Sequence, residues 1–146
     1  MLLWRKSMKV LIDANVLLDA LLGRTPYFEH ADDILKLCAD KDVQGYVAAH
    51  SITNLFYILR KDLSEEDRRN VLLNLCDILE VEGIDSAKIV SALQNRAFVD
   101  FEDCLQSSCA KIAGAKYIIT RNIKDFIGSE VQAVTPEEFL IMFNGA

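Results

Sequence analysis

The sequence contains few of the residues that build linkers and flexible tracts. Only 2 prolines and 6 glycines occur among 146 residues, and no segment is rich in Pro, Gly or Ser, repetitive or of low complexity. A chain of this length can bury a substantial core. We therefore expect a single domain over residues 8–146, preceded by a short N-terminal extension over residues 1–7.

Long apolar runs are also missing. The apolar stretches are short and interrupted by charged residues, so no segment is expected to span a bilayer. Residues 1–8 lack an apolar region followed by small residues and do not make a secretory signal. Met8 is a second candidate start, because the structured pattern begins there. These features predict a cytoplasmic protein with no membrane segment.

Histidine and cysteine do not occur in the patterns that zinc sites require. The two histidines, His30 and His50, lie in no ligand-spaced motif, and the four cysteines form no CxxC pair. Three of the cysteines fall in apolar helical patterns, which is typical of buried, reduced thiols in a cytosolic protein. Ser, Cys and His are likewise absent from any recognisable nucleophile motif.

Positive charge is in deficit. The chain has 16 Lys and Arg against 22 Asp and Glu, and its net charge is −6. This balance argues against a protein that binds nucleic acid by bulk charge, because phosphate neutralisation dominates such affinity. It does not exclude a nuclease, since acidic metal ligands lower the net charge and the metal restores positive charge locally.

What the sequence does contain is an alternation of short apolar strands and helices. The predicted strands cover residues 8–12, 45–49, 80–82, 116–120 and 131–134. The predicted helices cover residues 14–22, 27–40, 51–61, 64–79, 86–96 and 101–113, with a last one after 135. The N-caps of three of them are assigned to Ser51, Ser64 and Thr135.

This order predicts an α/β fold, a three-layer α/β/α sandwich around a mostly parallel sheet. Ligands of such sheets bind outside the carboxyl ends of the strands. The two strongest strands end at Asp13 and Thr120. We therefore expect the chemistry of this protein at these two positions.

Oxygen-bearing side chains gather at this predicted edge from three segments. They are Asp13, Asn15 and Asp19 after the first strand, Asp100 and Asp103 at a helix start, and Asn122 and Asp125 after Thr120. Hard divalent cations such as Mg²⁺ prefer these ligands. One or two such ions can generate hydroxide from water and stabilise an in-line phosphoryl displacement.

Each acid also has a simpler structural explanation. Asp13 can cap the helix that follows it. Asp100 and Asp103 can be an N-cap and a first-turn acid. Asp125, taken alone, is typical of a solvated loop. Their conjunction at one edge of the sheet favours a metal site.

At these residues the chain resembles the PIN domain family. Residues 10–19 resemble the opening strand of the family, with its Asp-x-Asn and a later aspartate. Residues 100–106 resemble the helix start that carries a second metal aspartate, here Asp103. Residues 117–122 resemble the Thr-Arg-Asp turn, and residues 51–55 the helix that presents a further acid. The resemblance extends over nearly the whole chain.

The resemblance implies cleavage of single-stranded RNA by water activated on Mg²⁺ or Mn²⁺. In bacteria, compact PIN proteins are often toxins of toxin–antitoxin pairs, usually homodimeric and blocked by a small antitoxin protein. The implied catalytic metal ligands are Asp13 and Asp103, assisted by Asp100, Asn122 or Asp125 and supported by Asn15, Asp19 and Asn54. Thr120 and Arg121 are expected to contact a substrate phosphate, Arg121 through paired hydrogen bonds.

Two positions depart from the family pattern and keep other functions open. Asn54 and Asn122 stand where the family has acids, and neutral amides hold a divalent cation less tightly than carboxylates. The second hypothesis is therefore a non-catalytic PIN-like module that binds RNA or protein with a degenerate metal site. The third is a receiver-type phosphoacceptor domain, for which Asp85, after the weak strand over residues 80–82, is a poor acceptor.

Overall fold

Five short strands form one sheet. The structure, a computed structural model, describes residues 8–145, so the predicted extension over residues 1–7 lies outside the described residues. The strands are β1 (Lys9–Ile12), β2 (Gln44–Ala48), β3 (Glu80–Glu82), β4 (Tyr117–Ile119) and β5 (Gln132–Val134). Their order is β3-β2-β1-β4-β5, and each neighbouring pair is parallel. The predicted parallel sheet is confirmed.

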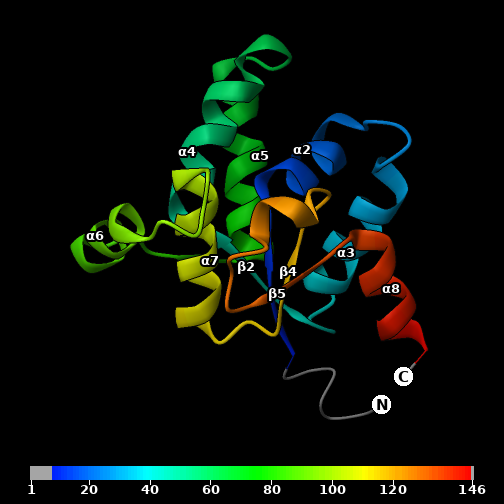
Figure 1. Cartoon of the computed structure of the whole chain (residues 1–146). Helices are drawn as coiled ribbons and strands as arrows, with labels where there is room; N and C mark the ends of the chain where they lie inside the picture. Colours follow the sequence, from blue (N-terminus) through cyan, green and yellow to red (C-terminus); the bar gives the residue numbers. More distant parts are fainter. Residues whose placement is uncertain (1–7, 146) are drawn as a thin grey trace.

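Helices connect the strands and cover both faces of the sheet (Figure 1). They are α2 (Ala14–Leu22), α3 (Phe28–Ala39), α4 (Ala49–Ile58), α5 (Glu65–Ile78), α6 (Ser86–Gln94), α7 (Phe101–Ala113) and α8 (Pro136–Asn144). Two 3-10 helices are η1 (Leu59–Lys61) and η2 (Ile123–Phe126). Helix α7, with α6 packed against it, covers one face, and the other long helices cover the opposite face. The three-layer α/β/α fold is confirmed.

Strand β1 lies at the centre of the sheet and is buried on both faces. Val10 and Ile12 point into the core on the α2 and α3 side, whereas Leu11 points toward α7. All three are completely buried, as is typical of a central parallel strand. The first polar side chain after these buried residues is that of Asp13, directly after the carboxyl end of β1.

Local capping signals set several helix ends where the sequence predicts them. Ser64 caps α5 through its side chain, and Thr135 forms a capping box with Glu138 at the start of α8. Gly23 and Gly114 end α2 and α7 in the left-handed conformation. Cys38, Cys104 and Cys109 are buried and all four cysteines are free, which agrees with the predicted reduced thiols.

The predicted N-cap at Ser51 is wrong. Helix α4 begins at Ala49, and Ala48 occupies the cap position without a side-chain hydrogen bond. Strand β2 runs directly into α4, so no polar loop residue separates them. Ser51 is instead buried in the first turn of the helix.

The receiver-type hypothesis is also wrong. Strand β3, which precedes Asp85, lies at the edge of the sheet and not in the middle. The carboxylate of Asp85 accepts a hydrogen bond from the backbone N–H of Lys88 at 2.9 Å and caps α6.

Among the helices in residues 8–145, none is long and apolar enough to cross a bilayer.

Gly45 in β2 offers a test of how tightly this core is packed. A Cβ added at Gly45 would lie 2.5 Å from Sγ of Cys38 and 2.6 Å from Cδ2 of Leu79. We expect Gly45→Ala to lower the free energy of unfolding by about 1–3 kcal/mol through overpacking, measured by urea denaturation. Gly83→Ala is the control, because a Cβ there meets nothing within 4 Å. Equal stability of the two variants would contradict the packing described.

Candidate functional site

Asp13 leaves β1 at the carboxyl edge of the sheet and is held there by three hydrogen bonds. Its backbone N–H donates to the carbonyl oxygen of Ile119 in β4 at 3.0 Å. Its side chain, which is 5% exposed, accepts from Oγ1 of Thr120 at 2.8 Å and from Nε2 of Gln106 at 3.1 Å. A buried carboxylate requires such partners. These two donors, one directly after β4 and one in α7, fix one orientation of the carboxylate.

Helix capping does not explain the Asp13 side chain. Asp13 occupies the N-cap position of α2 with an extended backbone, but its carboxylate makes no cap bond. Only its backbone carbonyl oxygen joins the helix, by accepting from the N–H groups of Val16 and Leu17. The side chain is committed to the neighbouring strand and to α7 instead.

Thr120 and Gln106 are the residues that orient Asp13. Thr120 is completely buried, and its hydroxyl oxygen also accepts from the backbone N–H of Asn122 at 3.0 Å. Its contact with a substrate phosphate stays a prediction. Gln106 is also buried, and its Oε1 has no hydrogen-bond partner among the described residues. A buried acceptor without a partner is rare in proteins and is available to a ligand or water.

Gln106 is a site residue that the sequence interpretation did not select. It lies in the segment that resembles the family motif, three residues after Asp103 and therefore on the same face of α7. That spacing is the signal that could have found it. An uncharged side chain in a buried helix turn is otherwise indistinguishable from an ordinary core contact.

Asp103, in the first turn of α7, has a strongly raised pKa. Burial raises the pKa of this carboxyl to about 7, and the negative charge of Asp100 adds to the effect. Asp13, Asp125 and Glu102 act in the same direction. The three predicted acidic segments therefore meet at Asp103, since charges from each of them influence its ionisation.

Asp100 and Asp125 are more exposed than Asp103. Asp100 caps α7 by accepting from the N–H of Asp103 at 2.9 Å, so its structural explanation is confirmed. Asp125 lies in η2, and Asn122 immediately precedes that turn. A cavity of about 330 Å³ lies between the start of α7 and η2, with Asp103, Asp125 and Lys124 in its lining.

Asn54, on α4, lies beside the acidic start of α7. Its Nδ2 donates to Oε2 of Glu102 at 3.0 Å. His50, also on α4, lies with Nε2 3.2 Å from the carbonyl oxygen of Glu102. Burial lowers the pKa of His50. Both α4 residues therefore hold the start of α7, and His50 was not a predicted site residue.

Asp19 and Arg121 pair with each other. Nε of Arg121 donates to Oδ2 of Asp19 at 2.7 Å and Nη2 to Oδ1 at 3.3 Å. Arg24 lies farther from the same carboxylate, at 3.9 Å, and the Arg121 guanidinium is 4.1 Å from the ring centroid of Tyr27. Asp19 is thus the anchor of Arg121. Phosphate contact by Arg121 stays a prediction, as does support of a metal by Asn15, half-buried in the first turn of α2.

The donor set at this edge fits a hydrated divalent cation. Within residues 8–145, no three His, Cys, Asp or Glu side chains are grouped closely enough to enclose a metal ion. Mg²⁺ needs no such cage, because it usually binds through one or two carboxylates and keeps several waters. Asp13 and Asp103 supply two carboxylates, and the unpartnered Oε1 of Gln106 offers an acceptor to a water of the ion.

Comparison with known proteins places the chain among related sequences and folds. A protein-family model described as "PIN domain" matches residues 9–124. Curated proteins, by contrast, gave no match to the sequence.

Several solved structures share the fold. A toxin–antitoxin complex from Klebsiella pneumoniae is similar with 25% identity and a TM-score of 0.65, covering 87% of this chain and 97% of that one. DNA-bound VapBC from Salmonella typhimurium is similar with 20% identity and a TM-score of 0.68, covering 88% and 98%. VapC20 of Mycobacterium tuberculosis, a toxin that cleaves the sarcin–ricin loop, is similar with 12% identity and a TM-score of 0.59, covering 75% and 86%.

The raised pKa of Asp103 predicts a pH-dependent effect on stability in the metal-free protein. The pKa in the folded state is about 7 and the ordinary value is 3.8, so stability is lost as pH rises between these values. We expect Asp103→Asn to melt at a higher temperature than the wild type near pH 8, and the gain to vanish near pH 4. Asp33→Asn, an exposed acid on α3, is the control. A gain independent of pH would contradict the electrostatic crowding.

The Asp19–Arg121 pair predicts an asymmetry between two arginines. Arg121→Gln leaves Asp19, which is 1% exposed, without its main partner, so we expect a loss of about 2 kcal/mol in the free energy of unfolding. Arg24→Gln removes only a longer contact from a more exposed arginine and should cost less than about 1 kcal/mol. Urea denaturation of both variants checks this. Similar losses of stability in the two variants would show that Arg121 is not the main partner of Asp19.

Proposed function

This chain belongs to the PIN domain family, and we propose that it is a ribonuclease that depends on Mg²⁺ or Mn²⁺ and cleaves single-stranded RNA. The observation that carries the proposal is the half-buried carboxyl of Asp103, whose pKa is raised to about 7 first by burial and then by the negative charges of the carboxylates around it. Like charges held together destabilise the folded protein. A divalent cation bound among them reverses that effect, so crowding of this kind is typical of metal sites.

In this proposal, Asp13 and Asp103 hold the cation directly. Thr120 and Gln106 keep the Asp13 carboxylate in one orientation through their hydrogen bonds. Asp100 and Asp125 line the cavity beside Asp103, and Asn122 immediately precedes η2, so their oxygens are the candidates to accept hydrogen bonds from water around the ion. When bound, the ion would activate water for attack on a phosphodiester and offset the charge that develops on the phosphate.

The structural relatives support a more specific role, the toxin of a toxin–antitoxin pair. The structure from Klebsiella pneumoniae is a toxin–antitoxin complex, the one from Salmonella typhimurium is a DNA-bound VapBC complex, and VapC20 is a toxin that cleaves the sarcin–ricin loop. By analogy, the partners of this chain are a small inhibitory antitoxin protein and a second copy of itself. Its substrate is RNA, approached at the carboxyl edge of the sheet.

A second candidate function is a non-catalytic RNA- or protein-binding module. Asn54 favours it, because a neutral amide stands at this position where the family has an acid. The amide donates to the carboxylate of Glu102. The exposed Asn122 adds a second neutral side chain at the rim. The two functions differ in whether the edge of the sheet binds a divalent cation at all.

Calorimetric titration with Mn²⁺ separates them. We expect the wild type to bind and Asp13→Asn to lose most of that affinity, because Asp13 is one of two direct ligands. The affinity should rise about tenfold from pH 6 to pH 8, since a proton competes for Asp103. Asp33→Asn should bind as the wild type does.

Two outcomes of that titration would contradict the proposal. If the wild type does not bind at millimolar Mn²⁺, the non-catalytic module is favoured. If Asp13→Asn binds as tightly as the wild type, the cation lies elsewhere. Circular dichroism melts of each variant establish that the fold is intact, and cleavage of a single-stranded RNA should follow the ranking of Mn²⁺ affinities.

A further inference from the structure

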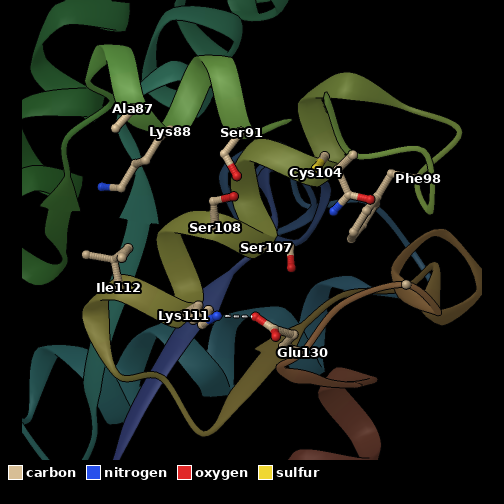
Figure 2. A pocket seen from close by; sticks show the side chains of 12 residues that line it. Ala87, Lys88, Ser91, Phe98, Cys104, Ser107, Ser108, Lys111, Ile112 and Glu130 are labelled. Atoms are coloured by element: carbon tan, nitrogen blue, oxygen red, sulfur yellow. Dashed lines mark ion pairs between the residues drawn. The ribbon is translucent and has the colours of Figure 1, made fainter. Parts of the chain in front are cut away.

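A second cavity adjoins the acidic site and carries two lysines in its lining. It has a volume of about 520 Å³ and lies between α6, α7 and the loop over residues 128–130 (Figure 2). More than half of its lining is apolar, and the polar part includes hydroxyl, amide and ammonium groups. They belong to Lys88, Ser91, Asn95, Ser107, Ser108 and Lys111. None of these residues has a role in the proposed cleavage site.

The two cavities are neighbours that share part of their walls, because Phe98 and Gly128 line both of them. Asp103, Ser107 and Lys111 follow one another at four-residue intervals and so share a face of the helix, over a rise of about 12 Å. This face of α7 thus carries the Asp103 carboxylate, then the Ser107 hydroxyl, which is hydrogen-bonded to Ser129, and then the Lys111 ammonium group. We call the larger cavity, which Ser107 and Lys111 line, the groove.

The cations of this groove differ in how firmly they are held. Lys88 is largely buried and donates to Oε2 of Glu82 at 2.8 Å. Lys111 is 60% exposed and pairs with Glu130, which is 70% exposed (Figure 2). An ion pair between two exposed side chains contributes little to stability. Lys111 can therefore exchange Glu130 for another anion at small cost.

We propose that this groove binds the sugar–phosphate backbone of the RNA strand whose scissile phosphate lies at Asp13 and Asp103. The inference rests on the proposed function, because that function supplies the substrate. Lysine and serine side chains are common ligands of phosphate and sugar oxygens. Phe98, half-buried where the two cavities meet, offers an aromatic surface on which a base can stack. In a chain of net charge −6, Lys111 supplies the local positive charge that RNA requires.

RNA binding in the presence of EDTA tests the groove without any cleavage. The probe is a fluorescein-labelled single-stranded RNA decamer, and the readout is fluorescence anisotropy over a range of salt concentrations. One phosphate contact to a single strand contributes about 0.7 to the salt exponent, so at about 0.1 M salt Lys111→Gln should weaken binding about fivefold. Lys36→Gln, which removes a similarly exposed and ion-paired lysine on α3, should leave both affinity and salt exponent nearly unchanged.

A gain of affinity provides a second arm that no folding defect can imitate. Glu130→Gln removes the carboxylate that competes with RNA for Lys111, so we expect binding to tighten at least about twofold. Glu65→Gln is the matched control, because Glu65 is a similarly exposed carboxylate paired with Arg69 and its loss changes the net charge equally. It should not tighten binding.

Three results would overturn the inference: no RNA binding by the wild type, equal effects of Lys111→Gln and Lys36→Gln, or equal effects of Glu130→Gln and Glu65→Gln. The absence of RNA binding would favour a protein partner for the groove. Equal effects of either pair of variants would show that RNA binding depends on the net charge of the protein and not on the groove. RNA binding that responds as predicted, in a protein that cleaves nothing when Mn²⁺ is restored, would support the groove and refute only the proposed ribonuclease function.

Discussion

The carboxylate of Asp13 is the constraint on which the rest of the site depends. It is buried at the end of the central strand, and its two side-chain partners are Gln106 in α7 and Thr120 directly after β4. These partners lie 93 and 107 residues from Asp13 in the sequence, so the hydrogen bonds form only when the sheet and the α7 layer are assembled. A buried carboxylate without partners is costly, which ties the geometry of the site to the stability of the fold.

The site contains one aspartate held in place by hydrogen bonds and one whose ionisation is disfavoured. Each carboxylate oxygen of Asp13 accepts one hydrogen bond from a neutral donor. The pKa of Asp103 is instead raised to about 7, first by burial and then by the charges of the carboxylates around it. Functional sites commonly hold such perturbed groups at the expense of stability. A cation bound between the two aspartates would offset the negative charge around Asp103. In the proposed function, the acidic cavity would bind the cation. The neighbouring groove would then contact the rest of the RNA backbone through its ammonium and hydroxyl groups.

The sequence predicted the fold and the acidic edge because their signals are local. Apolar runs indicate strands, caps such as Thr135 indicate helix starts, and parallel strands bring their carboxyl ends to one edge. Partnerships between side chains could not be predicted in the same way. No local pattern shows that Asp19 pairs with Arg121, or that Gln106 turns toward Asp13, because both depend on how α2, α7 and the segment after β4 pack.

The central claim is that Asp13 and Asp103 together hold a divalent cation. Diffraction from crystals soaked in Mn²⁺, collected where manganese scatters anomalously, tests it most directly. The account predicts an anomalous peak bonded to a carboxylate oxygen of each of these two aspartates. No peak at this edge of the sheet, or a peak bonded only to exposed acids elsewhere, would contradict it.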